Sequence, residues 1–101
     1  MDQQKARNGF GATPTASWTL LFGENNKRSW AAVNVPADAG DAVMLCLTQG
    51  ADVSGQYGLI QVEKGGSAVF SESGDMPWQG SILARGVDAD SEVVWCEVYK
   101  V

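Results

Sequence analysis

An all-β fold is predicted by three features of this 101-residue sequence. Short apolar runs recur roughly every ten residues and are separated by Gly, Asn, Asp and Pro, the residues that form turns. No run of about ten residues has the 3.6-residue period of an amphipathic helix. Apolar residues make up 45% of the chain and charged residues 19%, which is typical of a globular domain. We therefore expect an antiparallel β-sandwich or a small barrel of about seven to eight strands.

The N-terminal segment differs from the rest of the chain. The stretch from Gly9 to Ala16 is rich in small residues and in residues that break regular structure, and it has neither a strand period nor a helix period. We expect residues 1–16 to form an extended N-terminal arm and residues 17–101 to form a single β domain. Phe10 is the one large apolar side chain of this arm. Together with Pro14 it is a candidate contact for a partner protein.

Three strands are expected in the first half of the domain. The first covers residues 17–22 and ends at a turn formed by residues 23–27. The second covers residues 29–35 and ends before Pro36. The third covers residues 42–48, and its nearly continuous hydrophobicity predicts a central strand that is buried on both faces.

Four more strands are expected in the second half, over residues 59–62, 67–71, 81–85 and 92–99. The pair Gly65-Gly66 predicts a hairpin between the first two of them, because consecutive glycines allow the turns that match strand twist. In the last strand, residues 94, 96 and 98 are expected on one face, and residues 93, 95, 97 and 99 on the other.

The two cysteines, Cys46 and Cys96, both lie inside apolar strands. The N-terminus is polar and no apolar segment follows it, so we expect no signal peptide and synthesis in a cytoplasm, where thiols stay reduced. Both thiols are then small buried side chains. A disulfide between them stays open as an alternative, since it requires Cα atoms within about 7 Å. They lack the spacing of metal ligands, so no metal site is expected.

Charge and composition exclude several classes of function. With 12 acidic and 7 basic residues the chain has a net charge of −5, which disfavours binding to nucleic acids and to anionic membranes. No window approaches the roughly 20 apolar residues of a membrane span. The chain has no histidine, and it contains no phosphate-binding loop, dinucleotide-binding motif or serine nucleophile elbow. We expect no enzymatic activity and no cofactor.

The segment of residues 75–81 contains the strongest candidate for partner binding. Pro77 restricts its own backbone and that of Met76, which should hold Trp78 in a fixed direction. Trp78 then either caps one end of the core or acts as a surface anchor, and both alternatives stay open. Arg28 is expected to hydrogen-bond across the preceding turn or to the Asp75 loop. The candidate partner-binding residues are Phe10, Pro14, Arg28, Met76, Pro77 and Trp78.

The order of features from residue 17 to residue 101 resembles the small β-rich structural proteins of tailed bacteriophages. The resemblance rests on residues 25–28, 58–60 and 65–66, the run of residues 76–82 and the terminal strand of residues 93–98. It implies a non-enzymatic virion component, namely a capsid decoration protein or head accessory protein. Such a protein binds the major capsid protein or another virion protein on the capsid surface and stabilises the shell after synthesis in the host cytoplasm.

The resemblance also implies a homo-oligomer, with a trimer favoured, in which residues 1–16 become ordered on the shell and Phe10 acts as an anchor. A second hypothesis comes from the four tryptophans, which can stack on sugar rings. It is a carbohydrate-binding or receptor-binding module of a phage head fibre or tail. The sequence leaves strand order, and the choice between sandwich and barrel, undetermined.

Overall fold

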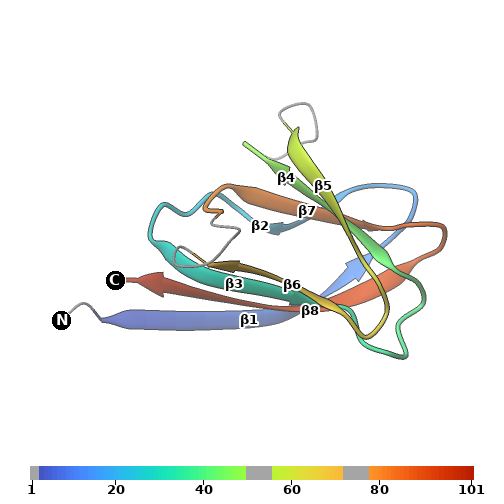
Figure 1. Cartoon of the computed structure of the whole chain (residues 1–101), viewed down its shortest axis with the longest axis horizontal. Helices are drawn as coiled ribbons and strands as arrows, with labels where there is room; N and C mark the ends of the chain where they lie inside the picture. Colours follow the sequence, from blue (N-terminus) through green and yellow to red (C-terminus); the bar gives the residue numbers. More distant parts are fainter. Residues whose placement is uncertain (1–2, 50–55, 72–77) are drawn as a thin grey trace.

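The computed structural model describes residues 3–49, 56–71 and 78–101, and within these ranges it contains strands and no helix. The strands are β1 (Gln4–Thr13), β2 (Thr19–Phe22), β3 (Arg28–Asn34), β4 (Val43–Thr48), β5 (Gln56–Val62), β6 (Ser67–Ser71), β7 (Ser81–Gly86) and β8 (Ser91–Lys100). They form two antiparallel four-stranded sheets that lie one above the other (Figure 1). The prediction of an all-β sandwich is confirmed, and the barrel alternative is not what the chain forms.

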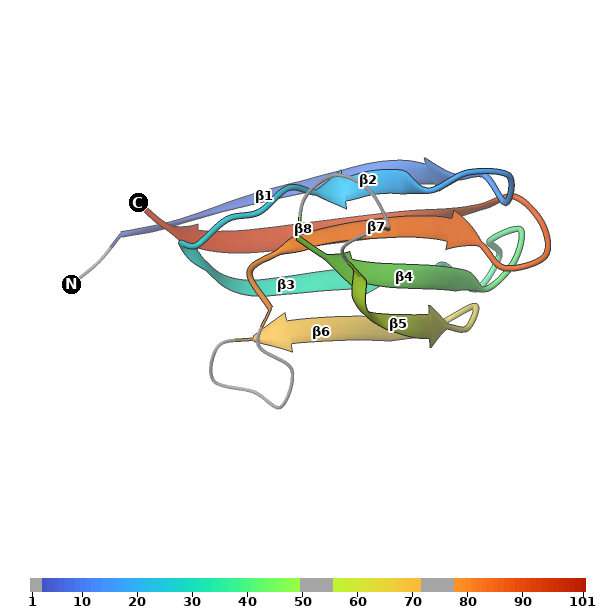
Figure 2. The same ribbon diagram turned by 90° about the horizontal axis from the view of Figure 1, so that it is seen from above.

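The topology is that of one long hairpin rolled into two layers. Each strand of the first half pairs with one of the second half: β1 with β8, β2 with β7, β3 with β6 and β4 with β5. Two further pairs, β3 with β8 and β4 with β7, give the sheet orders β1-β8-β3-β6 and β2-β7-β4-β5. This is a jelly-roll arrangement. In Figure 2, which looks through both layers, β1 overlaps β2 and β8 overlaps β7, with one strand of each pair in each sheet.

The core lies between the two sheets and follows from strand alternation. Side chains of alternate residues point to the same face, so Ala31 and Val33 of β3 face Val43 and Leu45 of β4, and all four are fully buried. Phe22, Val35, Ala39, Val62, Ala68, Phe70, Ile82, Ala84 and Val93 complete the buried cluster. The prediction that residues 42–48 form a central strand agrees with the position of β4 between β7 and β5.

The N-terminal segment is not a separate arm. Residues 4–13 form β1, which pairs with β8 without interruption from Gln4↔Lys100 to Thr13↔Ser91. The strand lacks a visible pattern for two reasons. Its residues 4–8 are exposed, so they need no apolar alternation, and a Cβ at Gly9 would lie 2.6 Å from the Trp95 ring. The predicted boundary at residue 16 therefore falls after the first strand of the sandwich.

The turn at Gly65-Gly66 is present but does not join a hairpin. β5 belongs to one sheet and β6 to the other, so the turn carries the chain across between the layers. Gly65 has a φ of 82°, and its N–H donates to the carbonyl of Val35 at 2.8 Å. The glycine signal thus gave the turn correctly. Local sequence did not show that β6 pairs with β3 instead.

Candidate functional site

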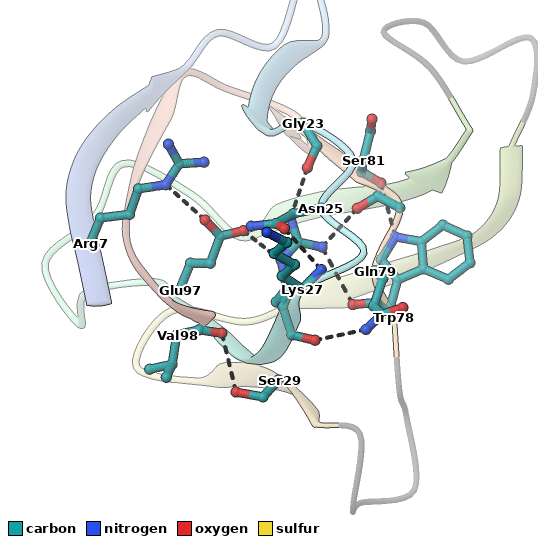
Figure 3. A network of polar contacts seen from close by, with 12 residues as sticks. Arg7, Gly23, Asn25, Lys27, Ser29, Trp78, Gln79, Ser81, Glu97 and Val98 are labelled. Atoms are coloured by element: carbon teal, nitrogen blue, oxygen red, sulfur yellow. Dashed lines mark hydrogen bonds and ion pairs between the residues drawn. The ribbon is translucent and has the colours of Figure 1, made fainter. Parts of the chain in front are cut away.

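One end of the sandwich interior is filled by charged side chains. Arg28 at the start of β3 and Glu97 near the end of β8 have side chains that are 1% and 0% exposed. Arg28 Nε donates to Glu97 Oε2 at 2.6 Å. We call this region, made of Gly23, Arg28, Trp78, Gly80 and Glu97, the polar end. Figure 3 shows its network of contacts.

The Arg28 guanidinium also binds carbonyl oxygens from the opposite sheet's connections. Its Nη1 donates to the carbonyl of Gly80 at 2.9 Å, and its Nη2 donates to the carbonyl of Gly23 at 2.8 Å. Gly23 directly follows β2, and Gly80 directly precedes β7. A planar guanidinium with several donors suits this task better than an ammonium group. One buried side chain therefore ties the ends of both sheets together.

Glu97 accepts from a second arginine on its other carboxylate oxygen. Arg7 Nε on β1 donates to Glu97 Oε1 at 2.7 Å, and the Arg7 side chain is 55% exposed. Because Arg7 and Glu97 are direct partners in the β1–β8 register, the pairing itself positions this contact. One arginine lies on each of the two strands that flank β8, so each oxygen of the buried carboxylate accepts a hydrogen bond from a cation. A buried charge needs such partners.

Aromatic rings separate this network from the apolar core. The Phe22 ring lies 5.2 Å from the Arg28 guanidinium, and it meets the Trp95 ring edge-on at a centroid distance of 5.0 Å. A cation over an aromatic face is attracted by the ring's charge distribution. Phe22 therefore contacts the charged pair while it also belongs to the buried apolar cluster.

Trp78 packs against the core at the polar end. Its indole N–H donates to the carbonyl of Ser81 at 3.0 Å, and its ring contacts the buried cluster. A Cβ at position 80 would lie 2.6 Å from this ring, which explains the glycine there. Gln79 donates to the carbonyl of Arg28 at 2.9 Å. Of the two alternatives for Trp78, the geometry favours the cap over the surface anchor.

The structure separates the six residues that were predicted for partner binding. Arg28 is buried, and its donors are used inside the protein, which corrects its assignment as a partner contact. Pro14 is half-buried and follows Thr13, which pairs with Ser91 at one end of β8, whereas Arg28 pairs with Tyr99 at the other end. Phe10 lies on β1 and is 68% exposed. Met76 and Pro77 lie outside the described residues.

Sequence reasoning missed Glu97 and Arg7. Glu97 occupies an inward position of β8, on the same face as Val93 and Trp95. A carboxylate within an otherwise apolar alternation is the signal that could have found it, because a buried charge requires a partner. The partner's identity had no comparable signal, since Arg7 and Arg28 are 90 and 69 positions away.

Neither Cys46 nor Cys96 forms a disulfide. Cys46 is fully buried in β4, and burial raises the pKa of its thiol. Cys96 is only partly buried in β8, so the prediction of a buried thiol holds for Cys46 alone. The two thiols lie in different sheets, and the disulfide alternative is not realised.

Residues 3–49, 56–71 and 78–101 hold neither a candidate metal site nor a candidate membrane-spanning helix. In these ranges no three His, Cys, Asp or Glu side chains gather where they could hold a metal ion. The same ranges include no helix with the length and hydrophobicity needed to cross a membrane.

The two stacked antiparallel sheets place the chain among the all-β sandwich proteins with jelly-roll topology. No protein-family model matches the chain, and no curated protein matches its sequence. Its fold is similar to a solved structure of Bacillus endospore appendages, described as a novel family of disulfide-linked pili. The TM-score is 0.57, the sequence identity is 17%, and the match covers 100% of this chain and 91% of that chain. At this identity the match shows a common fold.

This comparison overturns the expectation of a capsid decoration protein. The fold is shared along the whole chain with an endospore-appendage protein, and a capsid partner gains no support. The motifs behind the phage resemblance were turns around strands, such as residues 25–28 and 65–66. Such turn chemistry recurs in unrelated β-sandwiches, so it does not identify a function. The alternative of a sugar-binding or receptor-binding phage module rested on the four tryptophans. Trp78 and Trp95 pack against the buried cluster, and the comparison gives a phage module no support.

Proposed function

We propose that this protein is a structural subunit that assembles with copies of itself into a fibre. The observation that carries the proposal is the fold similarity to the endospore pilus protein over 100% of this chain and 91% of that chain. The similarity thus concerns the complete sandwich and not a fragment of it. The partner in this proposal is another copy of the chain, and the role is mechanical rather than catalytic.

The edges of the two sheets offer a route to assembly. β1 and β6 are the edges of one sheet, and β2 and β5 are the edges of the other. An edge strand presents a row of backbone N–H and C=O groups that another chain's strand can pair with. β1 is the longest of these edges, with 10 residues. Pairing between two different edges is a heterologous contact, and where the rotation from one subunit to the next does not close into a ring, it propagates into a filament.

Disulfide linkage is not part of this proposal. The chain has two cysteines, and both belong to inner strands of their sheets: Cys46 to β4 and Cys96 to β8. Neither is placed on an edge where a neighbouring subunit would add its strand. We therefore expect assembly to proceed in the presence of a reducing agent.

Electron microscopy and sedimentation of the purified full chain under reducing conditions test this proposal. Fibres, or species whose mass grows with concentration, are the expected result. A peptide with the sequence of residues 4–13 should shorten the fibres by occupying the edge that β1 pairs with, and a scrambled peptide is the matched control. A chain that stays monomeric at every concentration contradicts the proposal. Fibres whose length is unchanged by either peptide exclude β1 as the growing edge.

A further inference from the structure

The outer face of the β1-β8-β3-β6 sheet is apolar along its centre. The odd residues 91, 93 and 97 of β8 are buried, so its even residues face outward. The strand registers place alternate residues of β1, β3 and β6 on the same face. We call the following set the outer patch, in which Ala32 is covered by its neighbours: Ala6, Phe10, Trp30, Ala32, Val69, Val94, Cys96 and Val98. Phe10, Val69 and Val94 are 68%, 44% and 42% exposed.

The outer patch is unusual for an exposed sheet face. An antiparallel sheet with one wet face normally carries polar side chains there. We call the residues that pair with one another across the four strands a row. The three successive outward-facing rows that contain Val94, Cys96 and Val98 include no charged residue. Charges begin only at the two ends of β8, with Glu92 at one end and Lys100 at the other. An exposed apolar patch with a polar rim is typical of a protein contact.

We infer that the outer patch is the contact between two copies of this chain. In this dimer the outer faces of the two copies lie against each other, and a two-fold axis relates the copies. The axis lies between the two faces and runs across the strands, along the row of Asn8, Cys96, Ala32 and Val69. This axis lays β8 antiparallel on β8 of the second copy. Face-to-face sheets pack about 10 Å apart, so outward side chains of both copies meet in one layer.

Charge selects this axis over the alternative. Glu92 and Lys100 each lie four positions from Cys96 in the sequence. Rotation about the row through Cys96 therefore places Glu92 opposite Lys100 of the second copy, at both ends of the contact. An axis parallel to the strands would place Glu92 opposite Glu92 of the second copy and Lys100 opposite Lys100. Like charges facing each other disfavour that arrangement.

The shapes of the facing side chains agree with the same axis. The rotation exchanges the row of Phe10 and Val94 with the row of Ala6 and Val98. The large ring of Phe10 then faces the small Ala6 of the second copy. Large side chains opposite small ones allow two faces to interdigitate without voids. Phe10 thus contributes to a partner contact, as its sequence suggested, but from a strand within the sandwich.

The inference rests on the proposed function, because it names one contact of a self-assembling subunit. A contact between identical surfaces closes after two copies. It pairs subunits back to back and leaves all sheet edges available for growth. The fibre would then consist of paired filaments.

The test compares two matched substitutions by sedimentation equilibrium below the concentration at which fibres form. Val94→Lys puts a charge into the outer patch, and Leu59→Lys puts one at a similarly exposed site on β5, where Leu59 is 52% exposed. We expect the wild type and Leu59→Lys to dimerise alike and Val94→Lys to weaken dimerisation at least about tenfold, a loss typical of a charge left unpaired in an interface. Phe10→Ala, which adds no charge, should weaken it as well. Circular dichroism checks that each variant is folded.

Charge reversal tests the axis. Glu92→Lys and Lys100→Glu should each weaken the dimer, and the double variant should restore it. Equal dimerisation of Val94→Lys and wild type, or no restoration in the double variant, overturns the inference. If either result is found and fibres still form, the dimer contact is wrong but the proposed function as a fibre subunit stands. A wild-type chain that forms neither dimers nor fibres overturns both.

Discussion

The two ends of the sandwich interior are filled by opposite kinds of side chain. At one end Val33, Val43 and Val62 pack between the sheets, and we call this the apolar end. At the polar end, Arg28 and Glu97 lie on the inward faces of β3 and β8, which Val33 and Val93 occupy further along the same strands. Arg28 and Glu97 are as fully buried as Val33 and Val43, yet different forces hold the two ends together.

The difference lies in how specific each kind of contact is. Apolar burial is non-directional, so the apolar end accepts many side chains of similar volume. The polar end joins β1, β3 and β8 to the residues that follow β2 and precede β7, and each bond depends on one donor and one acceptor. The stability of the apolar end therefore depends on side-chain volume, whereas that of the polar end depends on the positions of individual donors and acceptors.

The largest expected effect comes from breaking the buried pair. Glu97→Leu leaves the Arg28 charge buried without its carboxylate, and we expect the free energy of unfolding to fall by about 3–5 kcal/mol. Urea denaturation monitored by tryptophan fluorescence measures this loss. Adding Arg28→Met to the same chain should recover most of it, because two apolar side chains of similar volume need no partner.

The matched control for that experiment is Arg7→Ala. Arg7 binds the same carboxylate, but its side chain is 55% exposed and its charge is screened by water. We expect a loss of at most about 1 kcal/mol. Equal losses for Arg7→Ala and Glu97→Leu would show that burial of Arg28 does not determine the strength of the polar end.

An intermediate effect is expected at the apolar end. Val43 is fully buried, and Val43→Ala removes two methyl groups, so the free energy of unfolding should fall by about 2 kcal/mol. Combined with Glu97→Leu, the losses should add to within about 0.5 kcal/mol, since the sites share no partner. A larger departure from additivity in this double-mutant cycle would show that the two ends are coupled.

The smallest effect is expected from Asp41 and depends on pH. The backbone N–H of Asp88 donates to Asp41 Oδ2 at 2.7 Å, and this bond, with that from Ala89, holds the pKa of the carboxyl below its ordinary value of 3.8. A lowered folded-state pKa adds stability that is present above about pH 3.8 and lost as pH falls through the folded value. Urea denaturation should therefore show wild type and Asp41→Asn converging at low pH. A constant difference between them would contradict this account.

The strands of the domain were largely predictable from the sequence, because β2 to β8 carry apolar runs bounded by turn residues. β1 was not predictable, since its first residues are exposed and Gly9 faces a tryptophan ring. The pairing of β6 with β3 was equally hidden, because a turn specifies a reversal and not the sheet that the next strand joins.

The polar end was beyond prediction for a different reason. Arg28 and Glu97 are 69 positions apart, and each charge considered alone fits a solvated surface. Only the rolled hairpin brings them together. Apolar positions can be inferred one strand at a time, whereas an ion pair requires the complete strand order.

The rolled hairpin also sets the order in which the chain can fold. Its tip, where β4 meets β5, joins near neighbours in sequence, whereas the β1–β8 contact between Arg7 and Glu97 closes a loop of 90 positions. Because loop closure slows distant contacts, we expect β1 to dock last. Pulse-labelling hydrogen exchange should show β4 amides protected before those of β1. Until β1 docks, β8 has a vacant edge, and the β1 strand of another copy can occupy it, so exchange between copies competes with completion of each fold.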